Sequence, residues 1–154
     1  MAGSRASVAS ADYDQDFVVW LNAHAEFLRQ GQWEQIDRDH LVEELEAMAK
    51  RERRELLSRL SVLIMHLLKW QFQASRRSRS WQNTIMTQRM DVLDVLADSP
   101  SLQPFLHERL PSVYAKARLQ AEVETGMDAQ QFPEQCPYSV AQILATDFWP
   151  DERF

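Results

Sequence analysis

The sequence predicts an all-α protein, a multi-helix bundle with one long central helix and an irregular, aromatic C-terminal segment. Residues 32–99, 68 consecutive positions, contain neither glycine nor proline, the two residues that most strongly interrupt helices. Apolar residues recur every three or four positions, as they do on one face of an α-helix. No segment shows the alternation of apolar and polar residues that is typical of a half-buried strand.

Length and composition predict a single domain. The chain has 154 residues, of which 45% are hydrophobic and 10% aromatic, and disordered chains lack this aromatic content. Residues 1–11 are rich in alanine and serine, so we expect a flexible tail before a helical domain over residues 12–154. The net charge of −6 is modestly acidic, which argues against the whole chain being a nucleic-acid binder.

The first helix is expected at about residues 13–30. Asp12 and Gln15 have the spacing of a capping box, and Gly31 is a natural C-terminal cap.

The long central helix is expected at about residues 38–73, with Asp37 as its N-cap. All six residues at 50–55 are charged and interrupt its apolar face. The helix therefore either continues through this stretch, or kinks or ends near residue 50. We favour continuity because the usual causes of a kink, proline and glycine, are absent.

Polar residues and prolines mark the later boundaries. Ser80 is expected to cap a third helix, and Ser99 with Pro100 to start another. Pro104 and Pro111 are expected to keep the next turns short, before a helix at about residues 111–125 that Gly126 stops.

The C-terminal segment combines aromatic residues with Pro133 and Pro137, so we expect an irregular loop wrapped on the core. Within it, Ser139 and Gln142 have the spacing of a second capping box.

The sequence also indicates a compartment. Cys136 is the only cysteine, and one thiol cannot form an internal disulfide, which fits a reducing environment. The N-terminus lacks the apolar run of a signal peptide, and no apolar run approaches the ~20 residues of a membrane span. We therefore expect a cytoplasmic protein that is not inserted in a membrane.

Two histidines are candidates for chemistry. His40 and Glu44 are four residues apart and share a helix face, which makes them possible ligands of a divalent metal. The motif lacks the second histidine of a zinc-protease helix, so a simple hydrogen-bonding role is the preferred interpretation. His66 lies on the apolar stripe. It can join His40 only if the central helix folds back or two copies cross antiparallel near Arg53.

A third candidate is the basic and aromatic segment 69–89. Residues 56–90 contain no acidic residue, and basic and aromatic side chains together can bind phosphates and stack on bases. We favour the alternative that the aromatic residues face the core and the arginines pair with acidic segments. The candidate nucleic-acid-binding residues are Lys69, Arg76, Arg77, Arg79 and Arg89.

Several short runs are distinctive in combination. They are His40–Glu46, His66–Gln71, Arg77–Trp81, Asp98–Leu102, Cys136–Tyr138 and Phe148–Pro150. Together, over about residues 13–150, they resemble the bacterial family catalogued as domain of unknown function twenty-nine. The resemblance implies a compact all-helical domain and no particular reaction. It makes the polar residues of these runs candidates for a functional or structural cluster: His40, Glu44, His66, Lys69, Arg79 and Trp81.

These observations favour a non-enzymatic helical protein that associates with itself or with a protein partner and needs no cofactor. The alternatives are nucleic-acid binding through segment 69–89 and a metal-dependent hydrolase or metal site around His40 and Glu44.

Overall fold

A computed structural model describes residues 12–151 of the chain. Every regular element in this part of the chain is helical, which confirms the all-α prediction. The predicted tail at residues 1–11 lies outside the described residues. The contacts divide the chain into two compact units with a boundary between Arg51 and Glu52. We call residues 12–51 unit 1 and residues 52–151 unit 2.

Unit 1 contains a helical turn at residues 12–15, helix α2 (Phe17–Arg29), the short helix η1 (Trp33–Gln35) and the beginning of helix α3. The prediction of one helix over residues 13–30 was wrong at its start. Asp16 adopts an extended backbone and its side chain accepts a hydrogen bond from the amide of Val19, so it caps α2 and separates it from the preceding turn.

The end of α2 follows the prediction. Gly31 has a φ of +68°, a left-handed conformation that glycine adopts without steric cost. The amide of Gln32 donates to the carbonyl of Phe27 at 2.8 Å, which closes the helix end with the long hydrogen bond of a Schellman motif.

Helix α3 (Arg38–Phe72) is one uninterrupted helix of 35 residues, as its lack of helix breakers predicted. Asp37 precedes it, and its Oδ1 atom accepts a hydrogen bond from the amide of His40 at 3.4 Å, which is the expected N-cap contact. The first part of α3 belongs to unit 1 and the rest to unit 2.

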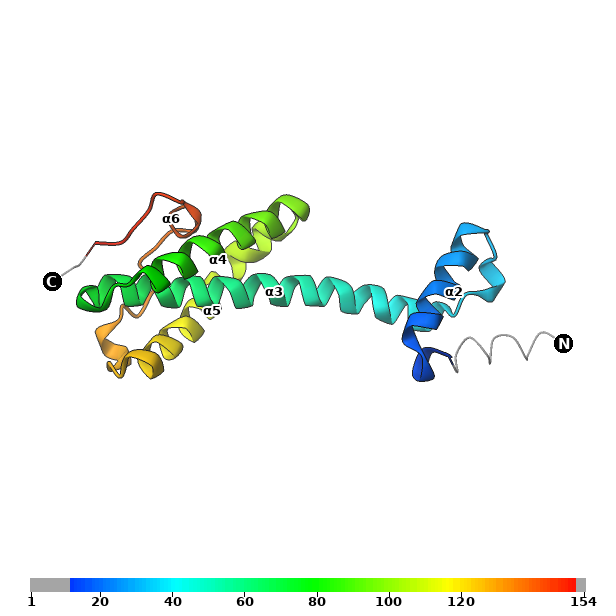
Figure 1. Ribbon diagram of the computed structural model, residues 1–154, viewed down its shortest axis with the longest axis horizontal. Helices are drawn as coiled ribbons and strands as arrows, with labels where there is room; N and C mark the ends of the chain where they lie inside the picture. The colour runs from blue at the N-terminus through cyan, green and yellow to red at the C-terminus, as the bar shows by residue number, and fades with distance from the viewer. Residues whose placement is uncertain (1–11, 152–154) are drawn as a thin grey trace. The chain divides into compact units, whose positions relative to one another are not determined.

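The core of unit 2 lies between three helices. Figure 1 shows helices α4 (Arg79–Asp98) and α5 (Leu102–Thr125) beside the second half of α3. Leu60, Leu67, Ile85 and Leu106 come from all three helices and have no exposed surface. Burial of these apolar side chains is the main stabilisation available to this unit.

Helix α4 begins earlier than the sequence suggested. The predicted cap, Ser80, lies inside the helix, whereas the side chain of Ser78 accepts a hydrogen bond from the amide of Trp81 at 3.2 Å. Either serine suits an N-cap by type. The short helix η2 (Ala74–Arg76) and the extended Arg77 bring the chain into the helix at Ser78.

Helix α5 corrects two predictions. It begins at Leu102 rather than at Pro100, and it continues through Pro111. Pro104 is tolerated because the amides of the first turn have no partner within a helix. Pro111 removes one internal hydrogen bond, yet Val113 and Tyr114 just beyond it are buried in the core. Gly126 ends the helix with a φ of +70°, as predicted.

The last segment is irregular and aromatic, as expected. After the short helix η3 (Ala129–Gln131) it contains only helix α6 (Val140–Leu144). Ser139 and Gln142 form the predicted capping box at the start of α6. Phe132, Tyr138 and Ile143 are buried against the core of unit 2.

Candidate functional site

Unit 1 contains a cluster of aromatic and histidine rings. Tyr13 stacks on His40 with 3.9 Å between ring centroids and meets the edge of Trp20 at 5.0 Å. Trp20 in turn stacks on His24 at 4.1 Å. Trp20 and His24, one helical turn apart on α2, are the only buried residues among residues 12–51.

His24 joins α2 to the start of α3. Its Nδ1 atom donates to the carbonyl of Trp20 at 2.9 Å, and its Nε2 atom accepts from the amide of Asp37 at 2.9 Å. A carbonyl can only accept and a backbone amide can only donate, so these contacts require the neutral imidazole with its proton on Nδ1. Both ring nitrogens are occupied, and the role of His24 is therefore structural. The sequence gives no sign of this partner, which lies 13 residues away.

Asp37 and His40 form an ion pair at the first turn of α3. The Nδ1 atom of His40 lies 2.6 Å from Oδ2 of Asp37. The hydrogen bond to Asp37 raises the pKa of His40, against an opposing effect of burial. Burial alone would raise the pKa of Asp37, but its hydrogen bonds with His40 and the histidine charge outweigh this and lower it. Both shifts favour the charged pair.

Glu44 contacts Tyr13 rather than His40. The Tyr13 hydroxyl donates to Oε1 of Glu44 at 2.7 Å, and this bond is the main reason that the pKa of Tyr13 rises to about 12. Nowhere in residues 12–151 do three or more His, Cys, Asp or Glu side chains come together in a way that could hold a metal ion. His40 and Glu44 thus lack the further ligand that the metal hypothesis requires.

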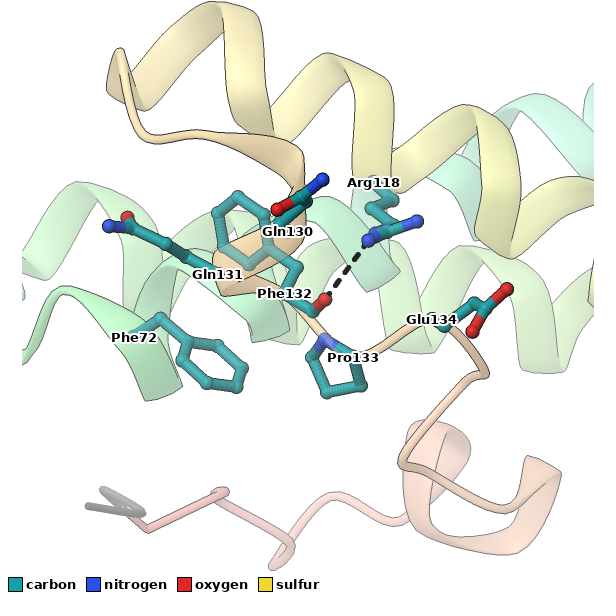
Figure 2. Close-up of a pocket in the computed structure, with 7 residues that line it drawn as sticks. All are labelled: Phe72, Arg118, Gln130, Gln131, Phe132, Pro133 and Glu134. Carbon is teal, nitrogen blue, oxygen red and sulfur yellow. Dashed lines mark hydrogen bonds between the residues drawn. The ribbon is translucent and has the colours of Figure 1, made fainter.

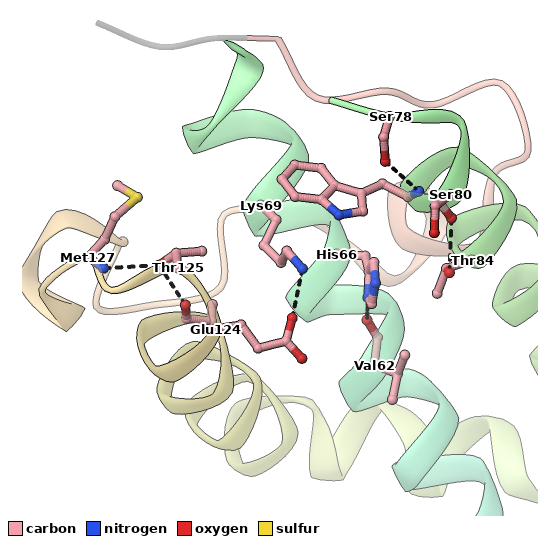
Figure 3. A network of polar contacts seen from close by, with 11 residues as sticks. Val62, His66, Lys69, Ser78, Ser80, Thr84, Glu124, Thr125 and Met127 are labelled. Carbon is pink, nitrogen blue, oxygen red and sulfur yellow. Dashed lines mark hydrogen bonds and ion pairs between the residues drawn. The ribbon is translucent and has the colours of Figure 1, made fainter. Parts of the chain in front are cut away.

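A second polar cluster lies in unit 2 (Figure 3). Lys69 is 8% exposed, its Nζ atom lies 2.7 Å from Oε2 of Glu124 on α5, and it sits 4.6 Å from the centre of the Trp81 ring. An ammonium group paired with a carboxylate and an aromatic face satisfies its charge within the fold. This contact is an instance of the predicted pairing between basic and acidic segments.

His66 lies one turn before Lys69 on α3. Its Nδ1 atom donates to the carbonyl of Val62 at 2.8 Å (Figure 3). Burial lowers the pKa of His66, and the charge of Lys69 adds to this effect, so the neutral imidazole is favoured. The second histidine of the predicted pair, His40, belongs to unit 1.

The basic residues of segment 69–89 have different environments. Arg76, Arg77 and Arg79 are exposed, and Arg77 donates from Nε to the carbonyl of Trp70 at 2.8 Å. Arg89 has no exposed surface. The sequence interpretation of Arg89 as a nucleic-acid contact needs correction, because a buried guanidinium cannot reach a phosphate. Lys69 is likewise buried.

Arg89 instead donates hydrogen bonds to the backbone of the C-terminal segment. Its Nε atom donates to the carbonyl of Ile143 at 2.8 Å, and its Nη2 atom donates to that of Phe148 at 2.7 Å. Burial lowers the pKa of Arg89. The sequence could not reveal this role, since one arginine in a basic segment looks like any other.

An open cavity of about 710 Å³ lies near the end of α3 (Figure 2). The edge-to-face pair Phe72 and Phe132, with ring centroids 5.5 Å apart, forms part of its wall. Arg118 and Glu134 are its only charged residues. Arg118 donates to the carbonyl of Phe132 at 3.2 Å (Figure 2) and to that of Ala129 at 3.0 Å. Arg118 therefore binds the backbone of the segment that forms the cavity wall.

The most unusual surface in the described chain is the apolar one on unit 1. Thirteen large hydrophobic side chains are exposed among the described residues, and nine of them belong to unit 1. Val18 and Leu45 are 65% and 58% exposed. Isolated exposed apolar residues are ordinary, but a concentration of them on one small unit is typical of an interaction surface.

These features define an all-helical protein whose polar candidates mostly bind other residues of the chain. The family model described as domain of unknown function DUF29 matches residues 13–149, so the chain belongs to this family. No curated protein and no solved structure matches the chain. No helix within residues 12–151 has the length and apolar character needed to cross a membrane.

Proposed function

We propose that this chain is a non-enzymatic protein-association module and that the apolar surface of unit 1 is where its partner docks. The observation that supports the proposal is the concentration of exposed apolar side chains on a unit that buries only Trp20 and His24. Water contact of this apolar surface costs free energy that a partner would recover on binding.

The exposed residues follow a helical pattern. Val18, Leu21, Ala25 and Leu28 on α2 are separated by three, four and three residues, and Val42, Leu45 and Ala49 on α3 by three and four; all seven are exposed. Alternating steps of three and four place side chains in one stripe along a helix, as in a coiled coil. We call these seven residues the docking surface.

Both stripes lie away from the side chains that join the two helices. Tyr13 contacts Glu44 and His24 contacts Asp37, where α2 crosses the start of α3 (Figure 1). At about 100° per residue, the α2 stripe lies to one side of Trp20 and His24, and the α3 stripe lies nearly opposite His40 and Glu44. Neither stripe is therefore used in the contacts between α2 and α3.

The alternatives have less support. The nucleic-acid hypothesis is weakened because Lys69 and Arg89 are buried and Arg77 already donates to a backbone carbonyl. If Arg76 and Arg79 nevertheless bound nucleic acid, affinity for an oligonucleotide would fall steeply with salt and with their replacement by alanine. The metal hypothesis lacks a ligand set among the described residues.

A photo-crosslinking amino acid tests the proposal in living cells of the native host. We expect p-benzoylphenylalanine at Leu45 to form an adduct with another protein molecule, identified by mass spectrometry. The matched control is the same amino acid at Val123, which is 82% exposed on α5 of unit 2 and should give none. Absence of an intermolecular adduct at Leu45 and at Leu21, or equal adducts at Val123, would contradict the proposal.

A further inference from the structure

We infer that the partner that fits the docking surface is a second copy of this chain, with helices α2 and α3 of one unit 1 packing on those of the other about a two-fold axis. The inference rests on the proposed function, because it concerns the same surface. Two short helices cannot enclose a core by themselves, whereas the four helices of two copies can.

The two stripes complement each other across such an axis. When α2 of one copy lies antiparallel to α3 of the other, heptad geometry sets Leu21 opposite Ala49 and Ala25 opposite Leu45. The next layer sets Leu28 opposite Val42. Each alanine then faces a leucine, and alternating large and small residues lets facing helices interdigitate closely. A two-fold interface is formed by the same patch on both copies, and this pairing meets that requirement.

The size of the surface also suits a dimer. The seven residues of the docking surface expose on the order of 500 Å² of mostly apolar area. A standard interface buries ~800 Å² per partner. Roughly 500 Å² of that area is apolar when the two subunits are identical. The apolar centre of a dimer is thus already present, and the polar rim would come from the flanking residues.

Binding of a second copy and binding of a basic partner should depend on salt in opposite ways. Residues 12–51 contain ten Asp and Glu against four Lys and Arg, whereas none of the seven docking-surface residues is charged. Two copies would therefore repel through their rims while their apolar centres attract. Salt screens such repulsion, so self-association should strengthen severalfold as ionic strength rises. Binding to a basic protein would weaken instead.

Sedimentation velocity of the purified full-length chain, over micromolar to sub-millimolar concentrations, tests this inference. We expect wild type to reach twice the chain mass. The double variant Leu21→Asp with Leu45→Asp should remain monomeric, and the milder pair Leu21→Gln with Leu45→Gln should shift the equilibrium toward monomer without risk to the fold. The matched control, Leu119→Asp with Val123→Asp, changes residues of α5 that are at least as exposed and should dimerise like wild type.

Cysteine pairs test the register in a Cys136→Ser background. A mixture of the single variants Leu21→Cys and Ala49→Cys should form an interchain disulfide on oxidation, whereas a mixture of Ala25→Cys and Ala49→Cys should not. A monomeric wild type, or a dimer that survives both docking-surface variants, would overturn the inference. If wild type is monomeric but Leu45 crosslinks to a different protein, the proposed function stands and only the second copy is refuted.

Discussion

In unit 2, the apolar stripe of each helix is covered by another element, whereas in unit 1 most apolar side chains stay in contact with water. Leu60, Leu67 and Leu106 have no exposed surface. Leu45, on the same helix as Leu60 and Leu67, is 58% exposed. One continuous helix thus serves two purposes: its second half completes a core, and its first half presents a surface.

The largest expected effect comes from truncating matched leucines on α3. Leu67→Ala should reduce the free energy of unfolding by about 2–5 kcal/mol, because it leaves a cavity in a closed core. Leu45→Ala should change it by less than about 0.5 kcal/mol at concentrations low enough for the monomer, as exposed substitutions usually do. Urea denaturation of both variants checks this, and equal losses would remove the distinction between the units.

The second prediction concerns Arg89, which donates hydrogen bonds to the C-terminal segment of unit 2. Arg89→Ala leaves the carbonyls of Ile143 and Phe148 without their donor, and we expect a loss of about 2–4 kcal/mol, since hydrogen bonds to buried charged groups are costly to break. Arg79→Ala, at an exposed site, is the control. Limited proteolysis should cut residues 139–151 faster in the Arg89 variant alone. A variant as resistant as wild type would contradict this role.

A smaller effect is expected from pH, with opposite signs in the two units. The raised pKa of His40 gives stability that is fully present below the ordinary histidine pKa and lost as pH rises through the raised value. The lowered pKa of His66 gives stability present above the ordinary value and lost as pH falls through the lowered one. Unfolding measurements at about pH 8 and about pH 5.5 should therefore show His40→Gln becoming more costly on acidification and His66→Gln less costly. If the cost of both substitutions changed in the same direction with pH, the opposite pKa shifts of His40 and His66 would be refuted.

The smallest effect concerns two tyrosines. The pKa values of Tyr13 and Tyr114 are both raised to about 12, the first mainly by its hydrogen bond to Glu44 and the second by burial. Glu44→Gln should return ionisation of Tyr13 toward its ordinary range and leave Tyr114 unchanged. Titration by ¹³C NMR of the ring carbons up to about pH 11 would follow this. An unchanged Tyr13 would mean that another cause dominates.

Much of the fold was predictable because local signals determine it. The lack of helix breakers predicted α3, Asp37 and Gly126 predicted helix ends, and the capping box at Ser139 predicted α6. The errors lie where several residues of the right type compete or where tertiary packing decides. Ser78 and Ser80 suit a cap equally by type, and Pro111 stays within α5 where the helix packs on the core.

The candidate site was less predictable, because several of its contacts join residues that are distant in sequence. His40 and Glu44 share a face, as their spacing required, but they do not bind each other: His40 pairs with Asp37 in the same helical turn, and Glu44 accepts from Tyr13, 31 residues earlier. The docking surface was within reach of the sequence, since Val18, Leu21, Ala25 and Leu28 already show heptad spacing. What the sequence lacked was any indication that no element within residues 12–151 covers them.

Hydrogen exchange measured by mass spectrometry at low and high protein concentration tests the central claim most directly, because it reports on the two units separately. We predict that peptides from residues 12–51 become more protected as concentration rises, while peptides from the core of unit 2 exchange at the same rate throughout. Exchange in residues 12–51 that does not respond to concentration, or protection that rises equally in both units, would contradict the claim that unit 1 carries the docking surface for a second copy.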